Sequence, residues 1–168
     1  MLEPAIKYAD ELIWEFEKIW FDDKYKYYVN APFYSEFEIY EDSCENHQFV
    51  SVLYRDVLGY IGYSVDRAAN IVYDLNIINF SDNKGTFGID VMQAIDDIFY
   101  RFNFDKIEFS VFIGNPAEKM YDKFIKMTGG RIVGTYKQHQ KLPDGKLYDM
   151  KMYELFKENY IDTFKGRR

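Results

Sequence analysis

The stretch from Ile71 to Asn115 limits most strongly what this chain can fold into, because it reads as strand, glycine-containing turn, helix and second strand. Apolar residues first alternate with other residues, then recur three and four positions apart, and then alternate again. A crossover of this kind favours parallel pairing of the two strands that it joins. The apolar positions are Ile71, Tyr73, Leu75 and Ile77 in the first strand, Val91, Met92, Ile95, Ile98, Phe99 and Phe102 in the helix, and Ile107, Phe109, Val111 and Ile113 in the second strand.

The turn that leads into this helix contains Gly85 and Gly88. A helix start leaves backbone N–H groups unpaired, and a glycine backbone lets a phosphate approach closely. The turn is therefore a candidate anion site. Two glycines are also ordinary turn formers, and the pair alone does not distinguish the two interpretations.

Segments on both sides of the central unit predict further strands. Phe49–Tyr54 and Val57–Val65 lead through a turn into the strand from Ile71, which indicates an antiparallel meander. Gly59 and Gly62, inside the second of these strands, suggest a bulge or a close approach by another backbone. Two more strands, at 131–137 and 146–155, form a terminal hairpin.

Two further helices are expected outside the central unit. Residues 3–21 form an amphipathic pattern, and another helix starts at Asn115-Pro116 and stops at Gly129-Gly130. A closing helical turn is indicated by Phe156, Tyr160 and Phe164. The predicted apolar faces are Ile6, Ala9, Ile13, Phe16 and Trp20, widened by Leu12 and Ile19, in the first helix, and Met120, Phe124 and Met127 in the second.

Composition narrows the classes of function. With 168 residues, 48% apolar content, 16 Tyr and 15 Phe, the chain can bury a sizeable core. Its net charge of −7 argues against a nucleic-acid partner, because phosphate contacts need clustered Lys and Arg. Cys44 alone excludes an internal disulfide, and His47 and His139 lack the spacing of metal ligands, so no metal is expected. Without a secretory signal or a membrane-spanning apolar run, we expect a soluble cytoplasmic protein that does not contact membranes.

Residues 29–48 form the segment whose structure the pattern defines least. A loop or short helix beside an open cleft is one interpretation, and an ordinary solvated surface is the other. In the first case the cleft would be acidic and aromatic, because the segment contains Tyr34, Glu36, Glu38, Tyr40, Glu41 and Asp42.

From about Phe49 to Leu155, this order of elements resembles the Gcn5-related N-acetyltransferase (GNAT) family. The hairpin Gly130–Lys137, followed by Asp144–Tyr153, is similar to the ending of the branch that acts on protein N-termini, antibiotics and amino sugars. The resemblance implies an α/β (α+β) fold: a mixed, mostly antiparallel central sheet with a V-shaped splay, flanked by helices. We expect one domain over 1–168, with an N-terminal helical and substrate-side region at 1–48, a core at 49–155 and a tail at 156–168.

The resemblance also implies acetyl-CoA as co-substrate. The family's pyrophosphate turn reads Gln or Arg, two residues, Gly, one residue, then Gly or Ala. This chain places Asn83 and Thr86 at the first two defining positions and Gly88 at the last, so two of the three depart from the pattern. Backbone N–H groups would still supply most phosphate contacts. The implied coenzyme-binding residues are Ile78, Phe80, Asn83, Lys84, Gly85, Thr86, Phe87, Gly88, Ile89 and Asn115.

The resemblance gives two catalytic candidates. Tyr121 would be the general acid, although the family's acid Tyr lies about seven residues after the position of Asn115, where Asp122 stands. One residue rotates a helical side chain by about 100°, so a packed Tyr121 is the alternative. Asp74 would be the general base, or simply a solvent-facing Asp on the side opposite Tyr73 and Leu75. Glu36, Glu38 and Glu41 are further candidates for the base.

Three functions remain open. The first is an acetyl-CoA-dependent N-acetyltransferase that moves an acetyl group to a primary amine of a small molecule or amino sugar by direct attack. The second is an N-terminal protein acetyltransferase. The third is a degenerate, non-catalytic acyl-CoA-binding protein of the same fold, which the departures at Asn83 and Thr86 favour. A homodimer is reasonable in view of the aromatic content.

Overall fold

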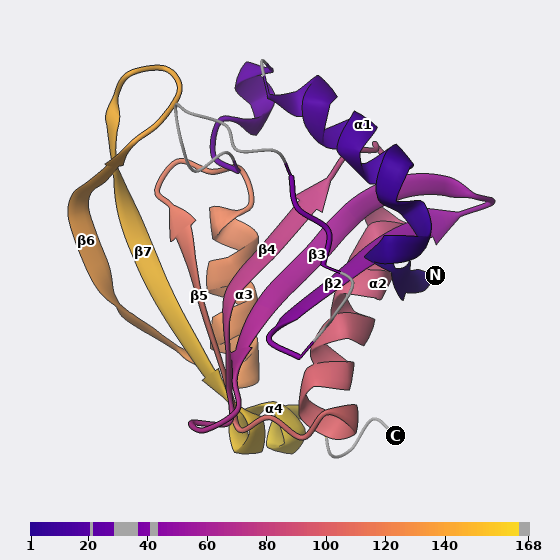
Figure 1. The fold of residues 1–168 in the computed structure, drawn as a ribbon. Coiled ribbons are helices and arrows are strands. Elements are labelled where there is room, and N and C mark those ends of the chain that lie inside the picture. The colour runs from indigo at the N-terminus through magenta and orange to yellow at the C-terminus, as the bar shows by residue number, and fades with distance from the viewer. Residues whose placement is uncertain (21, 29–36, 41–43, 165–168) are drawn as a thin grey trace.

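The computed structural model describes residues 1–20, 22–28, 37–40 and 44–164, and within them the chain forms a seven-stranded sheet with the order β1-β2-β3-β4-β5-β7-β6 (Figure 1). The strands are β1 (Leu2–Pro4), β2 (Asn46–Leu53), β3 (Asp56–Asp66), β4 (Ile71–Asn79), β5 (Lys106–Phe112), β6 (Arg131–Lys141) and β7 (Leu147–Phe156). The helices are α1 (Ala9–Ile19), α2 (Lys84–Asp96), α3 (Glu118–Thr128) and α4 (Lys157–Phe164), with short 3-10 helices at Ala5–Tyr8 and Asp23–Tyr25 and a π-helical turn at Asp97–Arg101.

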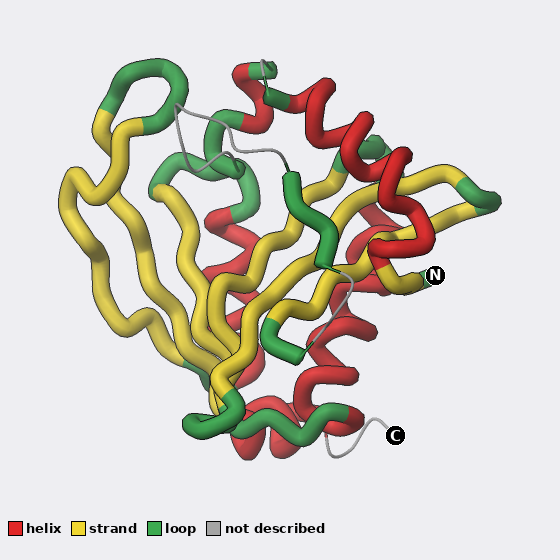
Figure 2. The backbone as a smooth tube through the Cα atoms, in the orientation of Figure 1, coloured by secondary structure: helices red, strands yellow, loops and turns green. Residues whose placement is uncertain are grey.

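The pairing of β4 with β5 defines the shape of the sheet. It is the parallel pair that the crossover predicts, whereas the other strand pairs are antiparallel. The two strands pair only at Ile71 with Lys106 and at Val72 with Ile107, and then diverge toward their carboxyl ends (Figure 2). The predicted mixed, mostly antiparallel sheet with a V-shaped splay and flanking helices is therefore confirmed.

Helices cover the two faces of the sheet unequally. α1 lies over one face, and α2, α3 and α4 lie on the other (Figure 1). The larger core lies on the side of α2, α3 and α4 and includes Val72, Phe99, Phe109, Ile125 and Tyr160, whereas a second core under α1 includes Leu12, Phe16, Val50, Tyr60 and Ile78. The sheet thus has one thickly covered face and one that is left partly open beside α1.

The N-terminal region differs from the single helix predicted over 3–21. Its first residues form β1, which pairs with β2, and a 3-10 helix precedes α1. Because a 3-10 helix has three residues per turn, the faces upstream and downstream of it do not align. Leu12, Phe16 and Ile19 are buried as predicted, but Ile6 is 49% and Ile13 39% exposed, so the predicted apolar face is wrong at those two positions.

The helix after β4 begins earlier than the sequence indicated. Asn83 is the N-cap of α2, and its side-chain oxygen accepts the Thr86 N–H at 3.1 Å. Gly85 and Gly88 therefore lie inside the first turns of the helix instead of in the loop. A side chain at either position would meet open space, so packing does not require glycine there.

α3 is also shifted relative to its prediction. It begins at Glu118, and Asn115 instead caps the preceding turn, where its Oδ1 accepts the Ala117 N–H at 2.9 Å. Gly129, in the left-handed region with φ of 72°, ends the helix as predicted. The inner face of α3 carries Tyr121, Phe124, Ile125 and Thr128, whereas Met120 and Met127, which were predicted for this face, are exposed.

A bulge between β3 and β4 changes the alternation along β4. The pairing shifts between Gly62 and Ser64, as the glycines suggested, and Asp74 on the partner strand has a φ of 51°. Beyond the bulge, Leu75 and Ile77 pack on the face covered by α2, as Val72 does before it. Tyr73 is therefore not on the same face as Leu75, contrary to the prediction, because the bulge inserts one residue into the period of two.

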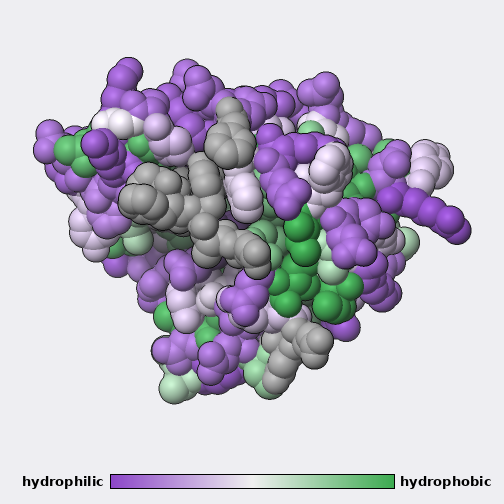
Figure 3. Space-filling view, turned by 45° about the horizontal axis from the view of Figure 1, so that its top comes forward, coloured by the Kyte–Doolittle hydropathy of each residue, from purple (hydrophilic) through white to green (hydrophobic). Residues whose placement is uncertain are grey.

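The surface in Figure 3 is mainly hydrophilic, with a hydrophobic area right of its centre. α4 packs against the larger core through Tyr160, which is 1% exposed. None of the helices in the described parts of the chain has the length and apolar character needed to cross a lipid bilayer. The expected homodimer stays a prediction.

Candidate active site

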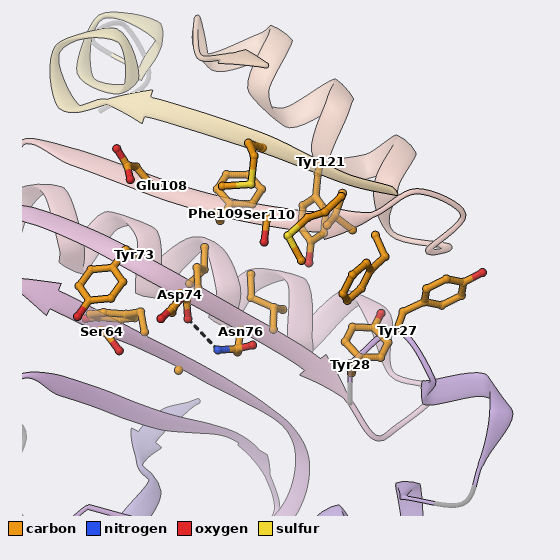
Figure 4. A pocket seen from close by; sticks show the side chains of 18 of the residues that line it. Tyr27, Tyr28, Ser64, Tyr73, Asp74, Asn76, Glu108, Phe109, Ser110 and Tyr121 are labelled. Carbon is orange, nitrogen blue, oxygen red and sulfur yellow. Dashed lines mark hydrogen bonds between the residues drawn. The ribbon is translucent and has the colours of Figure 1, made fainter. Parts of the chain in front are cut away.

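A cavity of about 650 Å³ lies where β4 and β5 diverge. Its walls come from strands β2 to β7, from α3, from the loop that follows β5, and from Tyr27, Tyr28 and Tyr40. Figure 4 shows part of this lining. This volume is in the range of small-molecule sites. We call this cavity the splay cleft.

Asp74 lines the splay cleft because of the bulge in β4. A positive φ is unusual for a residue other than glycine, and bulges next to active sites re-aim side chains. The Asn76 side-chain amide donates to the Asp74 carbonyl at 2.8 Å, which fixes the local backbone (Figure 4). The expectation that Asp74 faces away from both Tyr73 and Leu75 is wrong, because the bulge puts those two side chains on opposite faces of the sheet.

Tyr121 reaches the splay cleft from α3. Its ring packs edge-on against Phe109 at 5.5 Å between centroids. Burial, with a smaller contribution from Tyr28, raises the pKa of the Tyr121 hydroxyl above its ordinary value. The hydroxyl is therefore protonated at neutral pH and can act as a proton donor.

Asp122, which stands at the family's usual position for the acid Tyr, has other partners. It accepts the Tyr153 hydroxyl at 2.8 Å and binds the Lys151 ammonium at 3.0 Å. Asp122 does not line the cleft, whereas Tyr121, one residue earlier, does.

The backbone of β4 that is turned toward the splay belongs to Ile77 and Asn79. The Phe80 N–H donates to the Leu58 carbonyl at 2.9 Å, on the side of β3. Backbone groups alternate in direction along an antiparallel strand, so Ile78, paired with Tyr60, also bonds toward β3. The Asn79 carbonyl instead accepts the Tyr25 hydroxyl at 3.2 Å. The N–H groups of Ile78 and Phe80, which were expected to contact the coenzyme, thus point toward β3.

The N-terminus of α2 is largely occupied by acceptors from its own chain. The Lys84 N–H donates to the Asp82 carbonyl at 2.9 Å, and Asn83 accepts from Thr86 and Phe87. Of the four N–H groups from Lys84 to Phe87, that of Gly85 has no hydrogen-bond partner within the described residues. Phe87 is buried, while the side chain of Ile89 is 71% exposed. The position predicted for the anion site is a helix start with few open N–H donors.

Asn115 connects the loop after β5 to the segment after α1. Its Oδ1, besides capping the turn, accepts the Tyr28 hydroxyl at 3.4 Å. The side chain is buried and lines the cleft, so the structure brings Asn115, Tyr121 and Asp74 to one cavity.

The lining of the splay cleft is acidic and aromatic. Among the described residues, its carboxylates are Asp74 and Glu108, and it contains no Lys or Arg. Burial, then nearby Arg67, lowers the pKa of His47, so this side chain adds no positive charge at pH 7. The tyrosines of the lining are Tyr27, Tyr28, Tyr40, Tyr60, Tyr63, Tyr73, Tyr121 and Tyr136. Carboxylates and aromatic faces both attract cations.

Part of the predicted acidic segment can be placed. Tyr40 lines the cleft, and the Glu38 carbonyl accepts the Gln48 side-chain amide at 2.9 Å. Tyr34, Glu36, Glu41 and Asp42 lie outside the described residues. Among the described residues, no cluster of three or more His, Cys, Asp or Glu side chains could hold a metal ion.

Sequence reasoning missed Glu108 and Ser110. Both line the cleft, and both alternate in β5 with the buried Ile107 and Phe109. The alternation itself was read correctly, and its polar positions could have been assigned to the open face.

Comparison with solved structures identifies the fold. A spermidine N-acetyltransferase from Vibrio cholerae, in complex with CoA and spermine, superposes with a TM-score of 0.72 and 17% sequence identity, covering 96% of this chain and 97% of that one. An acetyltransferase of the GNAT family from Chromobacterium violaceum gives a TM-score of 0.68 and 16% identity, covering 95% and 88%. No protein-family sequence profile and no curated protein sequence matches the chain. The chain therefore has the GNAT acetyltransferase fold.

Proposed function

We propose that this protein is an acetyl-CoA-dependent N-acetyltransferase that acts on a primary amine of a small cationic molecule. The observation that carries the proposal is the splay cleft, into which Asp74 from β4 and Tyr121 from α3 both project. The GNAT fold of the chain raises the expectation of acyl transfer, while the site residues supply the specific argument.

The residues around the splay fit a coenzyme with a diphosphate and an extended amide arm. The backbone of Ile77 and Asn79 faces the gap left by β5, and an extended chain can pair with such an edge. The start of α2 would bind the diphosphate through the open N–H of Gly85, and a phosphate would reach the Thr86 N–H only by displacing the Asn83 side chain. When bound, acetyl-CoA would supply an acyl group activated as a thioester.

Asp74 and Tyr121 fit the two proton transfers of the reaction. The carboxylate of Asp74 would accept a proton from the amine, directly or through water, as the nitrogen attacks the acetyl carbon. A C–N bond then forms and the C–S bond breaks. The hydroxyl of Tyr121, which is protonated at neutral pH, would give its proton to the departing thiolate.

The charge of the cleft supports an amine substrate that carries further positive charge. Asp74, Glu108 and the tyrosine rings offer several places for an ammonium group, and no described Lys or Arg in the lining would repel it. The Vibrio cholerae spermidine N-acetyltransferase, which has a similar fold, is in complex with spermine, a linear polyamine, and this supports a polyamine acceptor for the present protein. We therefore place polyamines ahead of amino sugars and protein N-termini as acceptors.

A substrate screen tests this proposal. Purified protein is incubated with acetyl-CoA and one of three amines: spermidine, an amino sugar that carries no charge besides its single amine, or a short peptide with a free N-terminus. The products are quantified by mass spectrometry. Acetylated spermidine as the main product is the expected result. Acetylation of the peptide alone would favour the N-terminal acetyltransferase.

A non-catalytic acyl-CoA-binding protein is the second candidate. The self-capped start of α2, where Asn83 occupies the Thr86 N–H, favours it. Calorimetric titration with acetyl-CoA together with the screen separates the possibilities. Binding without any product would support this second candidate, and the absence of binding at about millimolar coenzyme would exclude both.

A further inference from the structure

The segment after α1 lies beside the loop between β6 and β7, although the two are more than a hundred positions apart in sequence (Figure 1). The Lys26 ammonium donates to Asp144 Oδ2 at 2.9 Å and to the Tyr148 hydroxyl at 3.0 Å. The Tyr148 hydroxyl in turn donates to Asp144 Oδ2 at 2.6 Å. We call these three residues the lysine clasp.

Aromatic rings enclose the ammonium of the lysine clasp. The Lys26 Nζ lies 5.2 Å from the centre of the Tyr27 ring and 5.4 Å from that of Tyr148. These two rings meet edge to face at 5.6 Å. The side chains of Lys26 and Asp144 are 23% and 19% exposed, so the pair lies at the surface but is partly enclosed by the two rings.

The charges of the lysine clasp stabilise each other. Hydrogen bonds from Tyr148 and then Lys26 hold the pKa of the Asp144 carboxyl well below its usual range. Tyr148 and Asp144 raise the pKa of the Lys26 ammonium. Both groups are therefore charged at every pH at which an amine could be acetylated.

The residues on either side of Lys26 connect the same segment to the splay. Tyr25 donates to the carbonyl of Asn79 at the end of β4, and Tyr28 donates to Asn115 in the loop after β5. Tyr27 and Tyr28 line the splay cleft, and Tyr28 is close enough to Tyr121 to raise its pKa. β4, the loop after β5 and the β6–β7 hairpin thus all contact residues 25–28. The lysine clasp is the contact with the hairpin.

We propose that Lys26 is a specificity-determining positioning residue, which holds Tyr27 and Tyr28 as a wall of the acceptor part of the splay cleft. This inference rests on the proposed N-acetyltransferase function. Lys26 does not line the cleft, so it acts through the two tyrosines. Asp144 has a second effect, because it neutralises an ammonium that would otherwise repel a cationic acceptor.

Steady-state kinetics on full-length variants test the proposal. Lys26→Ala is expected to raise KM for spermidine about five- to tenfold, as the loss of a charge-assisted hydrogen-bond pair allows, with kcat and the Kd of acetyl-CoA within about twofold of wild type. Lys26→Arg should restore most of the lost affinity, because guanidinium keeps the charge and the donors. Asp144→Asn should raise KM at least as much as Lys26→Ala, most strongly at low salt.

The matched control is Lys18→Ala. Lys18 also pairs with a carboxylate, Glu15, and also lies over an aromatic ring, Trp14, but it is on α1 and does not line the cleft. Its KM should stay at the wild-type value. Melting temperatures of all variants show whether a change in KM reflects unfolding.

The outcomes separate the two proposals. If wild type acetylates spermidine and Lys26→Ala leaves KM unchanged, or changes kcat and KM together with a fall in melting temperature, the role of Lys26 is overturned while the enzyme function stands. If wild type neither binds nor acetylates an amine in the presence of coenzyme, the proposed function itself is overturned, and the role of Lys26 with it.

Discussion

Tyr121 and Asp74 reach the same cleft from elements that are far apart in the chain, and their surroundings suit opposite tasks. Tyr121 is partly buried against Phe109, and burial raises its pKa, so it keeps its proton. Asp74 is exposed in the cleft on a strained bulge residue, where a substrate amine can reach it. Two groups in such different environments fit the roles of acid and base.

Tyr121→Phe is expected to lower kcat about 10²- to 10⁴-fold, because the ring packing is kept and only the donated proton is lost. The Kd of acetyl-CoA should be unchanged in calorimetry. Because the raised pKa keeps the hydroxyl protonated, wild-type kcat should show no alkaline decline below about pH 10 from this group. Tyr54→Phe, at a side chain that is 92% exposed, is the control and should be fully active. Comparable activity of the two variants would remove Tyr121 from the mechanism.

Asp74→Asn should reduce kcat/KM for the amine most at neutral pH and least at alkaline pH. At high pH the amine is already deprotonated, so a base is no longer needed. A pH profile of wild type and variant measures this. A loss that is equal at all pH values would indicate that Asp74 binds the substrate and does not accept its proton.

At the scale of single elements, the N-cap residue of α2 affects how well the start of this helix can bind an anion. Its N-cap Asn83 satisfies the Thr86 N–H that a phosphate would otherwise use. Capping stabilises the helix, but it competes with any anion that approaches the same donor.

Asn83→Gly should therefore strengthen acetyl-CoA binding several-fold, while the free energy of unfolding falls by only a few tenths of a kcal/mol, since glycine is tolerated at this position. Calorimetry and urea denaturation measure the two effects. Weaker binding in the variant would mean that the Asn83 side chain itself contacts the coenzyme.

The same elements show what could be predicted from the sequence. The meander, the parallel crossover and the terminal hairpin follow from periodicity and glycine positions, and they were assigned correctly. The start of α2 was misplaced because Gly85 and Gly88 look like loop residues, while a helix accepts them at modest cost. The face of Asp74 was misread because one inserted residue at the bulge, whose pairing shift only the folded sheet reveals, reverses every later position in β4.

At the scale of the whole molecule, hydrophobic clusters on both faces hold a sheet whose two central strands, β4 and β5, are paired only at one end. The larger core extends to α4, where Tyr160 packs against Phe99 at 4.9 Å and donates to Asp96 at 3.0 Å. Residues 157–164, which were expected to be part of a tail, therefore brace the end of the sheet where β4 and β5 still touch.

Tyr160→Ala should lower the free energy of unfolding by about 3–5 kcal/mol, as for other buried aromatics. Tyr160→Phe keeps the ring and removes the hydrogen bond to Asp96, so a loss of about 1 kcal/mol is expected. Urea denaturation followed by circular dichroism compares the two. Equal losses would show that the hydrogen bond, and not the packing, fixes α4.

The narrow contact between β4 and β5 has a consequence for how the protein responds to its coenzyme. Past Val72 and Ile107, the ladder between the two strands is interrupted, and the inward amide of Ile77 faces the gap. A pantetheine arm along this edge would form the hydrogen bonds with β4 that β5 does not make there. Deuterium uptake at Ile77 should then be fast in the free protein and slow with acetyl-CoA, with the midpoint of thermal unfolding rising in parallel.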